Sequence, residues 1–129
     1  MKILVIDNDT SIGITIKAAL GLNASYEVMV CLGAKEGLEE MKKNKYNLVL
    51  LDFMMPGISG VDLCKTMASD EKLKNIPVIL ISALPISSEV FQQSNDNFNR
   101  ISVVKGLLEK PFSVAELLGK VESVLNTTK

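Results

Sequence analysis

The stretch Leu48-Val49-Leu50-Leu51-Asp52 decides the fold of this chain, because it joins an unbroken apolar run to an acidic residue. The apolar residues do not alternate with polar ones, a pattern typical of a strand that is covered on both faces in a parallel sheet. Similar runs occur at 3–6, 28–30 and 78–81, with a weaker one at 106–108. We therefore predict five parallel strands.

Segments with helical spacing separate these runs. Apolar residues recur on one face over 11–20 and about 34–43, and a third helix is expected to start near 60. The last helix begins with a capping box at 113–116 and continues through 126. Turn-forming residues interrupt 87–105, where we expect a broken or extended fourth helix. The alternation predicts an α/β fold, a doubly wound five-stranded parallel sheet flanked by five helices in a single domain.

Composition excludes several classes of function. The chain has 129 residues, all assigned to that one domain (1–129), with no His and 14 Lys+Arg against 15 Asp+Glu. Without His, neither a Ser-His-Asp nor a Cys-His site can form, so carboxylates, Lys and hydroxyls must carry any chemistry. The near-neutral charge without a basic cluster argues against direct binding of nucleic acid or of an anionic membrane.

The two cysteines and the apolar segments bear on the compartment. Cys31 and Cys64 lie in an expected strand and helix, where they suit small buried side chains better than a disulfide. Met29 and Met41 are likewise expected to pack in the core. No apolar run approaches the length of a membrane span or a signal peptide. We expect a soluble, cytoplasmic protein.

Polar residues stand where the predicted strands end. Asp7-Asn8-Asp9 follow the first strand, Asp52 the third, Ser82 the fourth, and Lys110-Pro111 the fifth. In parallel α/β sheets ligands bind at this carboxyl edge, so these side chains are expected to meet there. Carboxylates, a hydroxyl and an ammonium group suit phosphoryl chemistry with a divalent cation such as Mg²⁺. Asp9 could also simply cap the first helix.

Four motifs in this order carry a resemblance that covers essentially the whole chain. They are Ile6-Asp7-Asn8-Asp9, the loop context 50–60 with its Met-Pro-Gly-x-x-Gly pattern, Ile81-Ser82-Ala83 and Lys110-Pro111-Phe112. Together they resemble the receiver domain of two-component response regulators. The resemblance implies the strand order 2-1-3-4-5 of that flavodoxin-like fold.

The resemblance also implies a role for each site residue. Asp52 would accept a phosphoryl group from a histidine kinase or a histidine phosphotransfer protein. Asp7, Asp52 and the backbone carbonyl of Met54 would bind Mg²⁺, while Ser82 would contact the phosphoryl group. Lys110 would pair first with Asp52 and then with a phosphoryl oxygen, and the Lys110-Pro111 peptide bond would be cis.

The same resemblance implies a signalling switch with no activity beyond phosphorylation from small donors and self-dephosphorylation. Phosphorylation would change the surface formed by the fourth helix, the fifth strand and the fifth helix. A downstream effector domain or protein and a phosphorylation-dependent dimer are the partners that this implies.

The sequence departs from the family pattern at three places. Asn8 stands at the second acidic position, so it would bind the metal weakly or through water. Leu107 stands where many members carry an aromatic switch residue, and the segment from Ser82 to Lys110 is several residues longer than expected.

Two alternatives remain open. A degenerate receiver would keep the fold as an interaction module and would seldom be phosphorylated. A small haloacid-dehalogenase-like phosphatase would use Asp7 as nucleophile and Asp9 as acid/base, because Asp7-Asn8-Asp9-Thr10-Ser11 resembles that family's motif.

Overall fold

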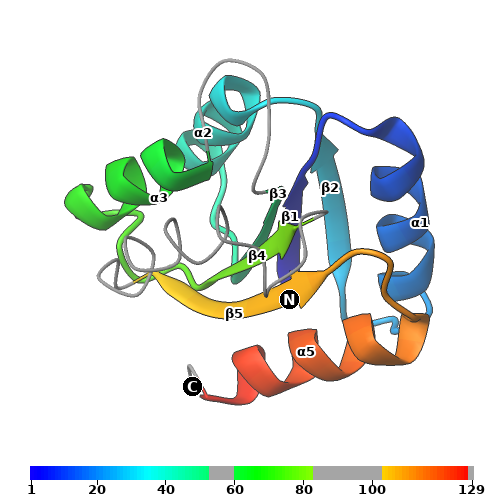
Figure 1. Cartoon of the computed structure of the whole chain (residues 1–129). Coiled ribbons are helices and arrows are strands. Elements are labelled where there is room, and N and C mark those ends of the chain that lie inside the picture. Colours follow the sequence, from blue (N-terminus) through cyan, green and yellow to red (C-terminus); the bar gives the residue numbers. More distant parts are fainter. Residues whose placement is uncertain (53–59, 83–102, 128–129) are drawn as a thin grey trace.

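The computed structural model describes residues 1–52, 60–82 and 103–127, which form five strands and four helices (Figure 1). In chain order the elements are β1 (Lys2–Ile6), α1 (Thr10–Leu20), β2 (Glu27–Cys31), α2 (Ala34–Lys43), β3 (Leu48–Asp52), α3 (Gly60–Ser69), β4 (Val78–Ser82), β5 (Val104–Glu109) and α5 (Val114–Thr127). Met54 and most of the segment predicted to hold the fourth helix lie outside the described residues. Within those residues, no helix is long and apolar enough to cross a membrane.

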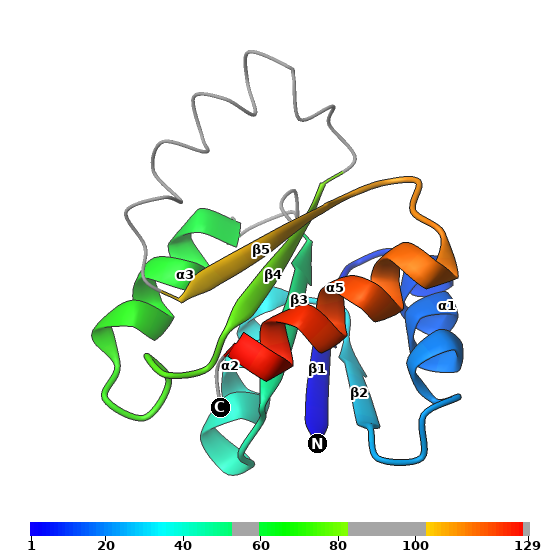
Figure 2. The same cartoon turned by 90° about the horizontal axis from the view of Figure 1, so that it is seen from below.

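The strands form one parallel sheet in the order β2-β1-β3-β4-β5. Helices α2 and α3 cover one face, and α1 and α5 cover the other (Figures 1 and 2). This confirms the predicted doubly wound α/β fold and its strand order. Because every strand runs the same way, the residues that end the strands lie along one edge of the sheet.

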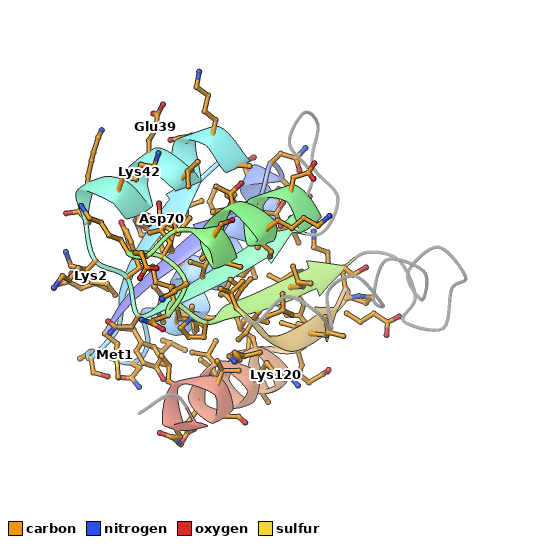
Figure 3. All side chains as sticks on the ribbon, turned by 90° about the vertical axis from the view of Figure 1, so that its left-hand side faces the viewer. Met1, Lys2, Glu39, Lys42, Asp70 and Lys120 are labelled. Atoms are coloured by element: carbon orange, nitrogen blue, oxygen red, sulfur yellow. The ribbon has the colours of Figure 1, made fainter. Side chains whose placement is uncertain are left out.

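The core is centred on the three inner strands. The apolar residues of β1, β3 and β4 are fully buried, as their unbroken apolar runs predict. The same expectation is wrong for β2 and β5, which are only partly buried because each lies at an edge of the sheet. Charged side chains such as Glu39 and Lys42 of α2 point away from the sheet (Figure 3).

The fifth strand is longer than the sequence predicts. It begins at Val104, so Val104 and Lys105 extend the sheet and do not belong to a fourth helix. Backbone pairing explains this, because Val104 lies opposite Val78 at the start of β4. The register shifts directly after that pair.

Sulfur-containing side chains lie partly as expected. Cys31, Cys64 and Met41 are buried, and both cysteines are free thiols. Burial raises the pKa of Cys64 to about 12. Met29 is 45% exposed, which corrects its assignment to the core. It lies on β2, at the edge of the sheet.

Candidate phosphoacceptor site

Four polar side chains lie at the carboxyl edge of the sheet, each placed by the end of a different strand. Asp7 directly follows β1, Asp52 ends β3, Ser82 ends β4 and Lys110 follows β5. Asp7, Asp52 and Ser82 are 0%, 5% and 2% exposed, among otherwise apolar buried residues. Burying two carboxylates so deeply is costly unless a cation or hydrogen-bond donors compensate their charge.

Lys110 supplies that compensation. Its Nζ lies 3.2 Å from Oδ2 of Asp7 and 3.9 Å from Oδ2 of Asp52. The ammonium group therefore bridges the two carboxylates, and the shorter contact is to Asp7. The resemblance implied a pair between Lys110 and Asp52 only, and the closer contact with Asp7 was not expected. Only 16% of the Lys110 side chain is exposed, so solvent screens the pairs weakly.

Backbone hydrogen bonds fix the positions of these groups. The Asp7 N–H donates to the carbonyl of Cys31 at 3.1 Å, and Oδ1 of Asp7 accepts from the Asp9 N–H at 2.9 Å. The Lys110 N–H donates to the carbonyl of Ser82 at 2.7 Å. The Lys110-Pro111 peptide bond is cis, as the resemblance implied.

The Ser82 carbonyl is a contact that sequence reasoning missed. It ties the end of β4 directly to the residue that carries the ammonium group. This contact is a backbone hydrogen bond that follows from the parallel pairing of β4 with β5, so no side-chain motif in the sequence indicates it.

The other two residues of the acidic cluster do not join the buried group. Oδ1 of Asp9 accepts from the N–H groups of Ser11 and Ile12 at 2.9 and 3.3 Å, so Asp9 is the N-cap of α1. Asn8 is exposed. Its predicted weak or water-mediated contact with a metal stays a prediction, and so does the role of Met54.

The donor set suits a hard divalent cation. Asp7 and Asp52 each direct a carboxylate oxygen toward the Nζ of Lys110, so the two carboxylates lie close together. Mg²⁺ is usually bound by one or two carboxylates with several waters retained. In the described ranges, no three His, Cys, Asp or Glu side chains cluster closely enough to hold a metal. Two carboxylates fit Mg²⁺, and a chain without His offers no imidazole ligand for a transition metal.

Known proteins share this sequence pattern and architecture. The family described as response regulator receiver domain matches residues 3–122. The chain belongs to the response regulator receiver family. Chemotaxis protein CheY-3 of Vibrio cholerae is 32% identical over 127 residues, covering 96% of this chain and 91% of that protein. The phosphate regulon regulator PhoB of Pseudomonas aeruginosa is 29% identical, and the match covers 98% of this chain and 52% of PhoB.

Solved structures agree with the receiver assignment. A receiver domain of a Francisella response regulator is 32% identical, with a TM-score of 0.82 over 99% of this chain and 98% of that domain. A CheY-like receiver domain protein from Methanospirillum hungatei is 25% identical, with a TM-score of 0.83 over 98% of this chain and 94% of that chain. The chain is thus a receiver domain of the two-component response regulators.

Leu107 is half-buried in this receiver, on β5 opposite Leu80 of β4. A shallow groove of about 470 Å³ runs between β5 and α5 beside it, lined by Leu107, Leu108, Glu109, Ala115, Glu116, Gly119, Lys120 and Ser123. The Leu107 side chain packs against the core on the α2 and α3 face of the sheet, whereas its neighbour Leu108 packs on the face that α5 covers.

Proposed function

We propose that this receiver domain is a phosphoacceptor switch in which Asp52 accepts a phosphoryl group from a histidine kinase or a histidine phosphotransfer protein. The observation that carries the proposal is the buried group of Asp52, Asp7 and Lys110, with Nζ at 3.2 and 3.9 Å from the two carboxylates. Burying these charges costs stability, so their presence points to a function, and phosphoryl transfer is the function that such charges fit.

The chemistry follows from the residues. An Asp52 carboxylate oxygen attacks phosphorus, and the bond from phosphorus to the donor nitrogen breaks with its electron pair staying on that nitrogen. The donor histidine leaves as neutral imidazole, because its other ring nitrogen already carries the proton. A carboxylate is already an anion at neutral pH, so no general base is needed in a chain without His. Ser82 and Lys110 would contact phosphoryl oxygens, the first as a hydroxyl donor and the second as a cation.

Mg²⁺ would be held by Asp7 and Asp52 with the backbone carbonyl of Met54, and Asn8 would contribute weakly or through water. When bound, the cation neutralises negative charge on the phosphoryl oxygens. Asp7 keeps its orientation because its Oδ1 accepts from the Asp9 N–H and its own N–H donates to the Cys31 carbonyl, so its Oδ2 faces Lys110.

The hydrogen bond between the Lys110 N–H and the Ser82 carbonyl supports a route for the signal. A phosphoryl group adds up to about two negative charges beside Lys110 and Ser82. Movement of these residues would shift β5, which carries Leu107. The surface of the fourth helix, β5 and α5 would then change its affinity for an effector domain or protein, or for a second phosphorylated copy. A cytoplasmic location is part of this proposal.

Phosphorylation by a small donor tests the proposal. With phosphoramidate and Mg²⁺, intact-mass spectrometry should show one added phosphoryl group on the wild type and none on Asp52→Asn. Asp62→Asn, on the exposed start of α3, is the matched control and should be labelled normally. Equal labelling of wild type and Asp52→Asn would overturn the proposal.

Two other outcomes identify the alternatives. A wild type that is folded but takes no label at saturating Mg²⁺ would favour a degenerate receiver. Label that depends on Asp7 and not on Asp52 would favour the phosphatase interpretation. That interpretation needs Asp9 as acid/base, whereas Asp9 caps α1.

A further inference from the structure

The edge strand β2 presents unused backbone groups to solvent. The Glu27 N–H donates to the Met1 carbonyl at 2.8 Å, and the Cys31 carbonyl accepts from Asp7 at 3.1 Å, so the odd-numbered residues of β2 face β1. Since backbone groups alternate along a strand, the N–H and C=O of Val28 and Val30 point to the open side. No turn, loop or helix in the described part of the chain forms a backbone hydrogen bond with them.

Natural proteins usually protect such an edge with Lys, Pro or a bulge. The sequence of β2, Glu-Val-Met-Val-Cys, contains neither Lys nor Pro, and its pairing with β1 is regular throughout. Its central residue, Met29, is 45% exposed. An apolar edge of this kind is open to strand pairing.

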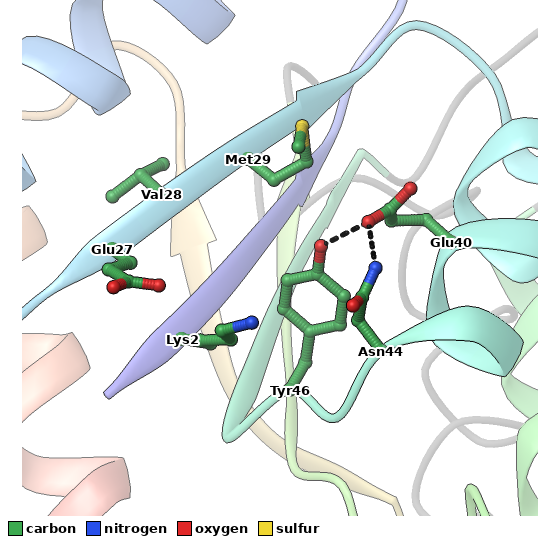
Figure 4. Close-up of a pocket in the computed structure, with 7 residues that line it drawn as sticks. All are labelled: Lys2, Glu27, Val28, Met29, Glu40, Asn44 and Tyr46. Atoms are coloured by element: carbon green, nitrogen blue, oxygen red, sulfur yellow. Dashed lines mark hydrogen bonds between the residues drawn. The ribbon is translucent and has the colours of Figure 1, made fainter.

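The surroundings of Met29 leave room for another side chain. Met29 and the ring of Tyr46 border one hollow of about 280 Å³ beside β2 (Figure 4), which is lined by Lys2, Glu27, Val28, Met29, Glu40, Asn44 and Tyr46. Tyr46 is held there, because its hydroxyl donates to Oε1 of Glu40 at 2.7 Å. Methionine adapts well to such an irregular apolar surface.

We propose that β2 pairs antiparallel with β2 of a second copy of this chain about a two-fold axis at Met29. The centre of the strand, Val28-Met29-Val30, reads the same in both directions. Val28 then lies opposite the partner's Val30, and Val30 opposite the partner's Val28. These are the residues with outward backbone groups, so the register forms four hydrogen bonds and satisfies all of those groups.

The same register suits the side chains and charges. Met29 meets the partner's Met29 in the closer, non-hydrogen-bonded type of pair, next to the two hollows. Glu27 falls opposite the partner's Cys31, so the two acidic residues are not opposed, and the net charge of −1 per chain gives little repulsion. The pairing involves none of the four side chains of the phosphoacceptor site and needs no phosphorylation.

Concentration-dependent mass and amide exchange test this pairing in the unphosphorylated protein. One short strand per copy makes a small interface, so dimerisation is expected between about 10 µM and about 1 mM. Light scattering should show the mass rising from 14.0 kDa toward twice that value over this range. Exchange of the Val28 and Val30 amides should slow at least several-fold as concentration rises, and that of Met29 should not respond to it.

The substitution Met29→Lys places two ammonium groups at the axis and should keep the protein monomeric at every concentration. Ile14→Lys, at a 70% exposed apolar residue of α1, is the matched control and should dimerise like the wild type. A chain that stays monomeric at 1 mM, or a dimer that Ile14→Lys dissociates and Met29→Lys does not, would overturn the proposal. The amide measurement uses the wild type alone, so it decides the question even if Met29→Lys folds poorly.

Discussion

Replacing Lys110 by Met removes the cation that holds two buried carboxylates together. With an effective dielectric constant of about 20, unit charges at 3.2 and 3.9 Å attract by about 5 and 4 kcal/mol before desolvation is subtracted. Removing one partner of a buried pair typically costs about 3–5 kcal/mol, because the remaining charge is left buried. We therefore expect Lys110→Met to lower the free energy of unfolding of the Mg²⁺-free protein by about 3 kcal/mol or more.

Added Mg²⁺ should reverse much of that loss. The site of the variant holds two carboxylates and no competing ammonium group, so Mg²⁺ should bind more tightly than to the wild type and raise the unfolding midpoint further. Urea denaturation with and without Mg²⁺ measures both effects, and Lys105→Met on the exposed face of β5 is the matched control. An Mg²⁺-free variant within about 0.5 kcal/mol of wild type would refute the reasoning, since that is the range of ordinary surface substitutions.

Three further changes test other parts of the account. Asn8→Asp should tighten Mg²⁺ binding about tenfold in a calorimetric titration, because it adds a unit charge near the metal. An affinity within twofold of wild type would mean that residue 8 does not face the site. Gly37→Ala should lower the free energy of unfolding by about 1–3 kcal/mol, because its Cβ would collide with the buried side chain of Ile6. Gly119→Ala, whose Cβ would have no neighbour within 4 Å, should stabilise α5 slightly, and a neutral Gly37→Ala would contradict the close packing. Burial raises the pKa of Cys64 to about 12, above the value near 9 of an unfolded thiol. The contribution of this thiol to stability is therefore complete below about pH 9 and is lost as pH rises toward 12. Urea midpoints should fall less steeply with rising pH in Cys64→Ala than in wild type, and equal slopes would contradict this.

The sequence predicts most of the fold because long apolar runs carry the decisive signal. Leu48–Leu51 had to be a buried strand, and the structure buries it completely. The pattern says less about which strands lie at the edges, since Val28-Met29-Val30 is also uniformly apolar. The resemblance gave the strand order and so put this strand at an edge, but the uniform apolar pattern still indicated burial on both faces, and the exposure of Met29 was missed for that reason.

The candidate site is predictable in its membership but not in its contacts. Four strand ends supply Asp7, Asp52, Ser82 and Lys110, and parallel topology brings them together. A carboxylate before a helix can be a cap or a ligand, so the sequence left Asp9 open and the geometry assigns it to the cap. The closer approach of Lys110 to Asp7 than to Asp52 depends on differences below 1 Å, which no sequence pattern contains.

Mapping the phosphorylated residue tests the central claim most directly. After labelling with phosphoramidate and Mg²⁺, borohydride reduction converts an aspartyl phosphate to homoserine, and peptide mass spectrometry locates the change. The account predicts homoserine at Asp52 and unmodified Asp7 and Asp9. Homoserine at Asp7, or a stable phosphoryl group on Ser82 or another hydroxyl, would contradict it.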